Sequence, residues 1–357
     1  MVALQRKLFA RSNFGAYMVN KQSFIDTDLQ RTNGFQSYNR DLGFEYNLAS
    51  ADNFWTGSSF YANTISPLQK DRSFSQAASL AYKDNDWTFS VKESWVGENY
   101  NPETGYVPRV NYFQTQLDAG KNFYPKNKST NIFYTTLSAM YMSYWNNQGN
   151  FTDNTSYVAY EGTMKDRSTF GAYLSYDYVK LLYDFDATRM GNAPLLKGSE
   201  HSWYALNTRY MSSPIKLFTY SLTSRIGGYY GNGWRTGITA DIGYRFQPYG
   251  SVSVAVDYND IVDVFVPGLD LVAPRKVASN FWIIRPKIDI TFSNKLFFAT
   301  FFQLNQQTKN INLNARLQWR YKPASDLFLV YTDNYFPEIM QIRNRALVLK
   351  LNYWLNL

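Results

Sequence analysis

Apolar and polar residues alternate one by one along most of the chain. Segment 310–321 reads "NINLNARLQWRY", in which every second residue from Ile311 to Tyr321 is apolar and the residues between them are Asn, Arg or Gln. Successive side chains of a β-strand point to opposite faces, so this segment predicts a strand with one apolar and one polar face. The same period recurs at 41–48, 234–246 and 251–259. Helical periodicity of comparable length is almost absent, which predicts an all-β fold.

The connections between these strands alternate between short and long. Short, turn-like connections rich in Gly, Pro, Asn, Asp and Ser are expected at 11–13, 50–53, 83–86, 125–129, 165–168, 212–216, 247–250, 293–295 and 322–326. Longer connections are expected around 26–36, 63–73, 96–108, 191–200, 262–278 and 334–341. Short periplasmic turns and longer extracellular loops are the layout of an outer-membrane barrel. The pattern therefore predicts an antiparallel transmembrane β-barrel of about 18–20 strands, with residues 1–357 as a single domain.

Composition supports the membrane interpretation. Aromatic residues make up 18% of the chain, yet the mean hydropathy is -0.40, because the aromatics stand singly between polar residues. No run approaches the ~18 apolar residues that a spanning helix needs, which excludes a helical membrane protein. Trp and Tyr stand at the ends of apolar sets, as at Trp234 and Tyr244, where amphipathic rings would meet a bilayer interface. A secreted all-β repeat protein is the alternative.

In the barrel interpretation the apolar face of each strand contacts lipid. The residues expected to point to lipid are Ile311, Leu313, Leu317, Val252, Val254, Val256, Leu347, Leu349 and Leu351. The phase of the alternation shifts near 177–180, which predicts a β-bulge, since a hairpin there would exchange the ends on which later loops emerge. Pro286 likewise predicts a bulge, because proline cannot donate to a strand ladder.

The residue types present argue against an enzyme and against a metal site. The chain has no cysteine and a single histidine, His201, which is more typical of an interfacial residue than of a catalytic centre. Asp257, Asp260 and Asp263 lack the spacing of a calcium loop, so no metal or cofactor is expected. The formal charge is +8, but the basic residues are dispersed, which argues against nucleic acid as a partner.

Charged residues on the expected lumen face form one candidate site. They are Arg209, Arg235, Asp241, Arg245, Asp257, Arg285, Lys287, Asp289, Arg316, Arg320 and Lys350. They would make an anion-favouring conduit or a sugar-binding track, or else a self-neutralising network that stiffens the barrel.

Loop segment 101–109, "NPETGYVPR", is the second candidate site. Its two prolines and its glycine restrict the backbone, Tyr106 could stack on a sugar, and Arg109 could bind a carboxylate or phosphate. The alternative is an ordered loop that folds back into the barrel.

Several segments resemble known outer-membrane proteins. The last segment, 345–357 ("RALVLKLNYWLNL"), resembles the C-terminal strand that such barrels present to the barrel assembly machinery, although Leu355 and Leu357 stand where an aromatic is common. Segments 6–23, 101–109 and 325–334 resemble the barrel part of an uncharacterised Bacteroidota family whose N-terminal domain is similar to carbohydrate-binding-module family nine. The resemblance implies a Gram-negative outer membrane, with lipid and lipopolysaccharide around the barrel, and hints at glycans. It implies no catalytic residues.

The expected function follows from the fold by association. The leading hypothesis is a conduit or binding barrel for a polar solute, with a glycan as one candidate. The alternative is a non-transporting anchor that holds a soluble domain or a protein partner at the outer membrane. The segments 2–8 and 346–357 are expected to run in the same direction, which gives an odd strand count, and the first nine residues carry no signal peptide. We therefore expect further strands and a soluble domain upstream in the parent protein.

Overall fold

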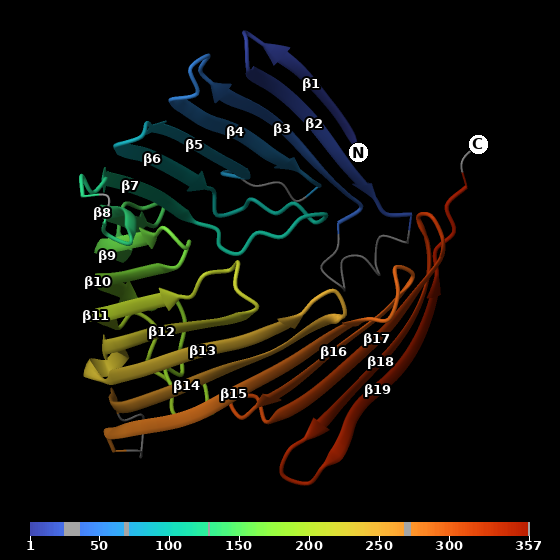
Figure 1. The fold of residues 1–357 in the computed structure, drawn as a ribbon. Coiled ribbons are helices and arrows are strands. Elements are labelled where there is room, and N and C mark those ends of the chain that lie inside the picture. Colours follow the sequence, from blue (N-terminus) through green and yellow to red (C-terminus); the bar gives the residue numbers. More distant parts are fainter. Residues whose placement is uncertain (25–35, 68–70, 128, 268–272, 356–357) are drawn as a thin grey trace. The chain divides into compact units, whose positions relative to one another are not determined.

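The fold consists almost entirely of β-strands. The computed structural model describes residues 1–24, 36–67, 71–127, 129–267 and 273–355. Over these residues the chain forms 19 β-strands and one single-turn 3-10 helix, η1 (Tyr230–Asn232) (Figure 1). The described ranges contain no α-helix, and thus no helix that is long and apolar enough to cross a bilayer. The prediction of an all-β antiparallel fold with about nineteen strands is confirmed.

The first compact unit contains residues 1–123, 136–159 and 176–180. Strands β1 to β7 lie in it, and each pairs antiparallel with the next in chain order (Figure 1). They are β1 (Val2–Leu8), β2 (Ser12–Gln22), β3 (Tyr38–Ala49), β4 (Trp55–Ile65), β5 (Phe74–Lys83), β6 (Trp87–Val96) and β7 (Tyr112–Phe123). The next three strands contribute residues to both units: β8 (Ile132–Trp145), β9 (Phe151–Met164) and β10 (Thr169–Lys180).

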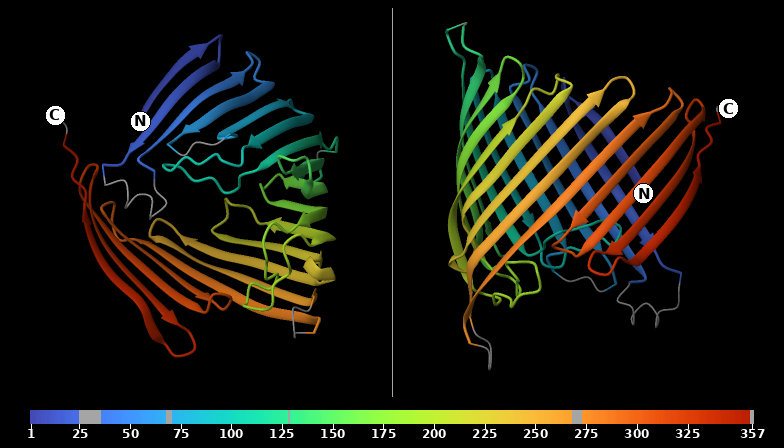
Figure 2. Two further views of the ribbon diagram at one scale, coloured as in Figure 1. Left: turned by 180° about the vertical axis from the view of Figure 1, so that it is seen from behind. Right: turned by 60° about the horizontal axis from the view of Figure 1, so that its bottom comes forward.

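The second compact unit contains residues 124–135, 160–175 and 181–357. Figure 2 shows β11 to β19 running side by side, and each pairs antiparallel with the next. They are β11 (Glu200–Met211), β12 (Phe218–Gly228), β13 (Trp234–Phe246), β14 (Gly250–Val266), β15 (Arg275–Thr291), β16 (Leu296–Asn305), β17 (Asn310–Lys322), β18 (Ser325–Phe336) and β19 (Gln341–Leu351). Each predicted short turn coincides with a connection between two strands, as at 84–86 and 247–249, although the turns predicted at 11–13, 83–86, 247–250 and 322–326 extend into the neighbouring strands.

The two faces of the strands differ as the alternation predicts, and the exposed face is the apolar one. In β13 and β14 the register places Ile242 opposite Val254, and Tyr244 opposite Val252. Large apolar side chains on this face stay exposed, with 53% for Ile242 and 68% for Leu349. Many side chains on the other face are hydroxyls, amides and charges that bond to one another, such as Thr239 and Asp257. We call these the apolar face and the polar face.

Aromatic side chains gather near both ends of the strands on the apolar face. Next to the short turns, the Trp55 and Tyr82 ring centroids lie 5.1 Å apart, and Lys121 Nζ lies 4.6 Å from the centroid of the Trp87 ring. Next to the long connections, Phe74 contacts Trp95 edge-on, with ring centroids 5.0 Å apart. Additional pairs are Trp319 with Tyr321, Tyr210 with Tyr220 and Tyr258 with Trp282. The predicted placement of aromatics at the ends of the apolar sets agrees with these contacts.

The bulge expected near 177–180 is wrong, because β10 ends at Lys180 and residues 181–199 form a long connection. The apolar residues that broke the phase belong to this connection, which has its own packing. A bulge does occur in β14, where the register shifts between Ile261 and Val264 and Asp263 has a φ of 58°. It turns Val264 and Val266 toward the polar face, where both are buried.

Pro286 does not produce a bulge. The pairs on either side of it, Ile284 with Leu304 and Lys287 with Phe301, keep one register between β15 and β16. Proline lacks the N–H that a ladder bond would need, but its position is accommodated without an inserted residue. Two predicted long connections are shorter than expected: β14 and β15 extend into 262–278 and leave 267–274 between them, and β18 and β19 leave only 337–340 of 334–341. Most of the predicted loop at 26–36 lies outside the described residues.

A charged pair interrupts the apolar face in the last hairpin. Arg345 shares this face with Leu347 and Leu349, and its guanidinium lies 2.7 Å from Asp333 Oδ2. Asp333 has no exposed surface, and the hydroxyls of Tyr331 and Tyr335 also donate to it. A carboxylate on an apolar face is tolerated when a cation and several donors neutralise it. β19 ends at Leu351, and Leu357 lies outside the described residues.

Candidate functional site

The connection 97–111 folds over the polar face of β2, β3 and β4. Asn39 Nδ2 donates to the Asn101 carbonyl at 2.9 Å, and the Glu103 N–H donates back to Asn39 Oδ1 at 3.2 Å. Glu103 also forms an ion pair with Lys21 of β2. The Tyr100 hydroxyl donates to the buried Asp41 at 3.3 Å. The Asn101 N–H also donates to Thr64 Oγ1 of β4 at 3.4 Å, so the loop is tied to three strands and is an ordered element of the first unit.

A polar cavity lies beneath this loop, and we call it the loop pocket. Its volume is about 640 Å³, and its lining is mostly amides, hydroxyls and two tyrosines. The residues that line it include Gln36, Asn39, Thr64, Ser73, Asn99, Tyr100, Asn101 and Tyr106. Tyr106, singled out from the sequence, is 88% exposed, so one aromatic ring stands at the rim of a hydrogen-bonding cavity. That arrangement suits a ligand with many hydroxyls.

Arg109 does not serve as a free anion-binding group. Its Nη1 donates to Asp153 at 2.7 Å and its Nη2 donates to Thr152 at 2.9 Å. The guanidinium carbon also lies 4.9 Å from the Tyr144 ring centroid and 5.7 Å from that of Tyr112. The residue therefore fastens the end of the loop to β8 and β9, and the expectation that it binds a ligand is not supported by this geometry.

Most of the charged residues assigned to the lumen face lie on the polar face with partners. Arg285 pairs with Asp257 at 2.6 Å, Lys287 with Asp289 at 2.8 Å, and Arg320 with Asp326 at 3.3 Å. Arg235 donates to Asn259 at 2.7 Å, Arg245 to the carbonyls of Pro214 and Lys216, and Ser221 donates to Asp241. The three ion pairs correspond to the self-neutralising alternative, whereas Arg235, Arg245 and Asp241 bond to neutral groups.

Three of the predicted cations differ from the rest. Arg209, Arg316 and Lys350 are exposed. Within the described part of the chain no ion pair forms at any of the three. The polar face of the second unit therefore keeps an excess of positive charge over its paired network.

His201 has a structural environment. Its Nδ1 accepts from the Gly231 N–H at 3.3 Å, and its Nε2 lies 2.9 Å from Ser199 Oγ. The imidazole thus fixes η1 against the start of β11. The described residues hold no cluster of three or more His, Cys, Asp or Glu that could bind a metal ion.

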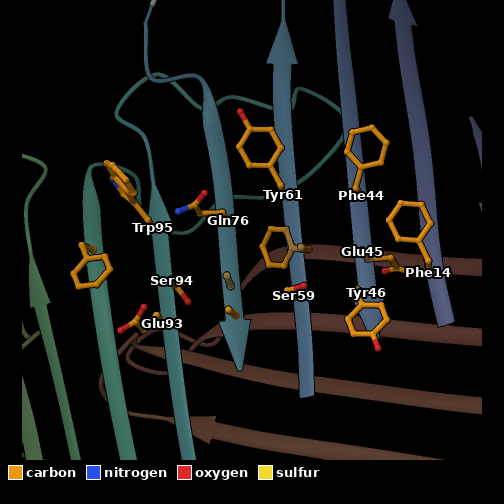
Figure 3. A pocket seen from close by; sticks show the side chains of 14 residues that line it. Phe14, Phe44, Glu45, Tyr46, Ser59, Tyr61, Gln76, Glu93, Ser94 and Trp95 are labelled. Atoms are coloured by element: carbon orange, nitrogen blue, oxygen red, sulfur yellow. The ribbon is translucent and has the colours of Figure 1, made fainter. Parts of the chain in front are cut away.

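The apolar face of the first unit carries a shallow groove. Its volume is about 400 Å³, and Figure 3 shows Phe14, Phe44, Tyr61 and Trp95 standing around the smaller Ser59. Gln76 and Glu93 also line it, on the same face as these rings. The alternation did not reveal this carboxylate, because Glu93 occupies an apolar position of the β6 pattern.

Comparison with known proteins gives a family and distant structural similarities. A family model described as "Domain of unknown function (DUF5916)" matches residues 18–263. No curated protein matches the chain. The siderophore receptor PirA from Acinetobacter baumannii is similar at 8% identity and a TM-score of 0.40, over 96% of this chain and 70% of the receptor. A mutant ferric enterobactin receptor, PfeA, from Pseudomonas aeruginosa is similar at 7% identity and a TM-score of 0.43, over 91% and 67%.

Proposed function

We propose that this chain, which belongs to the DUF5916 family, is an outer-membrane β-barrel that binds a polar solute on its polar face. The observation that carries the proposal is the reversed distribution of side chains: large apolar groups are exposed on one face, and hydrogen-bonded polar groups occupy the other. In water that arrangement would expose an extensive apolar surface, which soluble monomers avoid. In a bilayer the same side chains contact hydrocarbon at no such cost.

The backbone and the aromatic rows support a membrane-spanning role. Antiparallel ladders pair the backbone groups of neighbouring strands, as hydrocarbon requires of any spanning segment. The aromatic pairs near both strand ends match the two interfacial girdles of outer-membrane barrels. Lipid and lipopolysaccharide would then surround the apolar face, and the barrel assembly machinery would receive the last strand.

The loop pocket supports a solute with many hydroxyls, and a glycan is the class that fits best. The exposed amide of Asn101 lines the pocket with a donor and an acceptor, and Tyr106 offers a ring for stacking. Sugars combine hydroxyls with a flat apolar face, so both features have a partner on the ligand. A non-transporting anchor remains the second candidate, because the paired charges and the inward loop would serve it equally well.

A pair of arginine substitutions tests the membrane assignment. Val254 lies on the apolar face and Ser253 on the polar face of one strand. An arginine at mid-membrane on a lipid-facing position costs about 2–4 kcal/mol. Val254→Arg should therefore reduce the heat-modifiable folded band on refolding into lipid, whereas Ser253→Arg should leave it close to wild type. Equal folding of the two variants would contradict the assignment.

A glycan array and planar-bilayer conductance separate the two candidate functions. Binding of neutral glycans that Tyr106→Ala abolishes, in a chain that still folds, would support solute binding at the loop pocket. Conductance in addition would indicate a conduit. A folded, membrane-inserted chain with neither property would favour the anchor.

A further inference from the structure

Three polar side chains line the shallow groove on the apolar face of the first unit. They belong to Glu93, Gln76 and Ser59 (Figure 3). In the part of the chain that the structure describes, none of the three side chains forms an ion pair or a hydrogen bond. A carboxylate that faces lipid without a partner is unfavourable, and such a residue marks a site for a ligand or partner. We call this groove the carboxylate groove.

The carboxylate groove is formed by two neighbouring rows of residues across β3, β4, β5 and β6. The row nearer the long connections is mostly aromatic and consists of Phe44, Tyr61, Gln76 and Trp95. The row nearer the short turns has two small residues at its centre and consists of Tyr46, Ser59, Ala78 and Glu93. Because Ser59 and Ala78 are small, they form the floor of the groove beside the rings. Glu93 therefore lies at one end of an apolar channel.

The position of Glu93 along β6 brings its carboxylate close to one membrane interface. Trp95 follows two residues later and contacts Phe74 in the aromatic row next to the long connections. At the usual rise of a strand, Glu93 lies about 7 Å from Trp95 and about 20 Å from Trp87 at the other end of β6. Aromatic girdles lie at the level of the lipid headgroups. A headgroup next to Trp95 can therefore reach the Glu93 carboxylate.

Among the groups that a lipid offers, a protonated primary amine fits this carboxylate best. Phosphates carry the same sign of charge as Glu93 and are repelled, and acyl chains have no polar atoms. A quaternary ammonium has the opposite charge but no N–H donor. A primary ammonium has both the charge and three donors, and charge-assisted hydrogen bonds are the stronger ones. The Gln76 amide, opposite Trp95 in the ladder, can donate to a phosphate oxygen of the same headgroup.

We propose that the carboxylate groove binds one lipid whose headgroup carries a protonated primary amine. The inference rests on the proposed membrane location and goes beyond the proposed solute binding, which concerns the polar face. Glu93 accepts the ammonium N–H groups, and Gln76 donates to the phosphate of the headgroup. The first part of an acyl chain packs on Ser59 and Ala78, beside the aromatic rings.

Native mass spectrometry of the refolded full chain in detergent tests the site with three lipids that have identical acyl chains. They are phosphatidylethanolamine, phosphatidylcholine and phosphatidylglycerol. Phosphatidylethanolamine should bind at least about tenfold more tightly than the other two, because it alone donates ammonium N–H groups to a carboxylate. Equal affinity for phosphatidylethanolamine and phosphatidylcholine would overturn the proposal, since the N–H donors would then not matter.

Variants locate the lipid within the groove. Glu93→Gln should weaken phosphatidylethanolamine by about tenfold or more and leave phosphatidylglycerol unchanged. Glu98→Gln is the matched control, because it removes an exposed glutamate of the same unit that does not line the groove. Ala78→Phe fills the floor without changing any charge, and it should abolish lipid binding even if Glu93→Gln fails to fold. Equal loss in Glu98→Gln and Glu93→Gln would reject the groove as the site.

The same spectra distinguish a lipid from a second copy of the chain. A dimer that is present in the wild type and dissociates in Glu93→Gln would assign the groove to a protein contact and overturn the proposal. A chain that enters a bilayer but shows no preference for phosphatidylethanolamine would reject only the lipid site. Failure of the chain to enter a bilayer would instead reject the proposed function.

Discussion

The two loops that fold onto the polar face are held by different forces. Loop 97–111 is anchored by polar contacts, through Asn39, Glu103 and Arg109, and Tyr106 beyond them is exposed. Loop 181–199 is anchored by buried apolar residues such as Leu195, and by backbone bonds between its own halves. A polar contact contributes little net free energy, because its groups bond to water instead when the loop opens. Burial of an apolar side chain contributes more, because opening the loop exposes that side chain to water. We therefore expect loop 181–199 to stay closed under conditions that release loop 97–111.

The absence of cysteine makes this comparison directly measurable. A single cysteine at Tyr106 or at Leu182 places a spin label on either loop, since both side chains are exposed. The mobility of the label in electron paramagnetic resonance reports whether the loop is closed. Urea titration of that mobility gives the free energy of opening for each loop.

Removal of the apolar anchor should give the largest effect. Leu195→Ala deletes a side chain that is 1% exposed, and truncation of a buried leucine costs about 2–5 kcal/mol. The label at position 182 should become mobile at much lower urea, and loop 97–111 should not respond. Leu182→Ala, read with a label at Tyr183, is the control because Leu182 is 45% exposed. An unchanged opening energy in Leu195→Ala would refute the apolar anchor.

Removal of one polar anchor should have a smaller effect, confined to the other loop. Arg109→Ala breaks the ion pair with Asp153 and the stack against Tyr144, both partly exposed. We expect loop 97–111 to open about 1–2 kcal/mol more easily, measured with the label at position 106. Arg72→Ala is the control, because Arg72 bonds to the loop through its backbone carbonyl, which the substitution keeps. It should leave the free energy of opening of loop 97–111 unchanged. Equal effects of the two variants would remove Arg109 from the anchor.

The contrast between the loops also marks what the sequence could and could not predict. Alternation is a local property, so strand faces and most turns followed from it, as β13 and β14 illustrate. The fate of a loop depends on partners distant in sequence. Arg109 looked available for a ligand because nothing near it in the sequence indicated Asp153, which lies in β9.

The alternation of apolar residues in loop 181–199 led to a wrong prediction for the same reason. Leu181, Tyr183 and Phe185 alternate like a strand, yet Leu181 and Phe185 pack into the core under the loop. A cavity of about 300 Å³ in the second unit is lined by Arg189 of loop 181–199, Arg225 of β12 and Arg235 of β13, and no spacing in the sequence reveals that these residues meet. Arg345 at an apolar position is likewise explained by Asp333, a partner that only the fold supplies.

A change of pH should have the smallest effect on loop opening. Acid should open loop 181–199, and alkali should open loop 97–111. Burial raises the pKa of Asp186 in loop 181–199, but hydrogen bonds from Thr188, Gly191 and Asn192 outweigh it and hold that pKa below its usual value. A lowered pKa in the folded state means that the stabilisation is present above the unfolded pKa of about 3.9 and is lost as the pH falls through the folded value. Burial, with the nearby Asp41 carboxylate, raises the pKa of Tyr100 in loop 97–111. That stabilisation is complete below the unfolded tyrosine pKa of about 10 and is lost as the pH rises.

Spin labels at positions 182 and 106 should therefore loosen at opposite ends of the pH scale. Loop 181–199 should become mobile in acid, by about 1 kcal/mol, the typical contribution of a carboxylate that caps several backbone N–H groups. Loop 97–111 should become mobile in alkali by a similar or smaller amount, because the Tyr100 hydroxyl makes one bond of 3.3 Å to Asp41. Asp186→Asn should abolish the acid response and Tyr100→Phe the alkaline one, each without altering the other loop. Acid loosening of both loops together would mean that the strands beneath them had opened, and the two anchors would then not be independent.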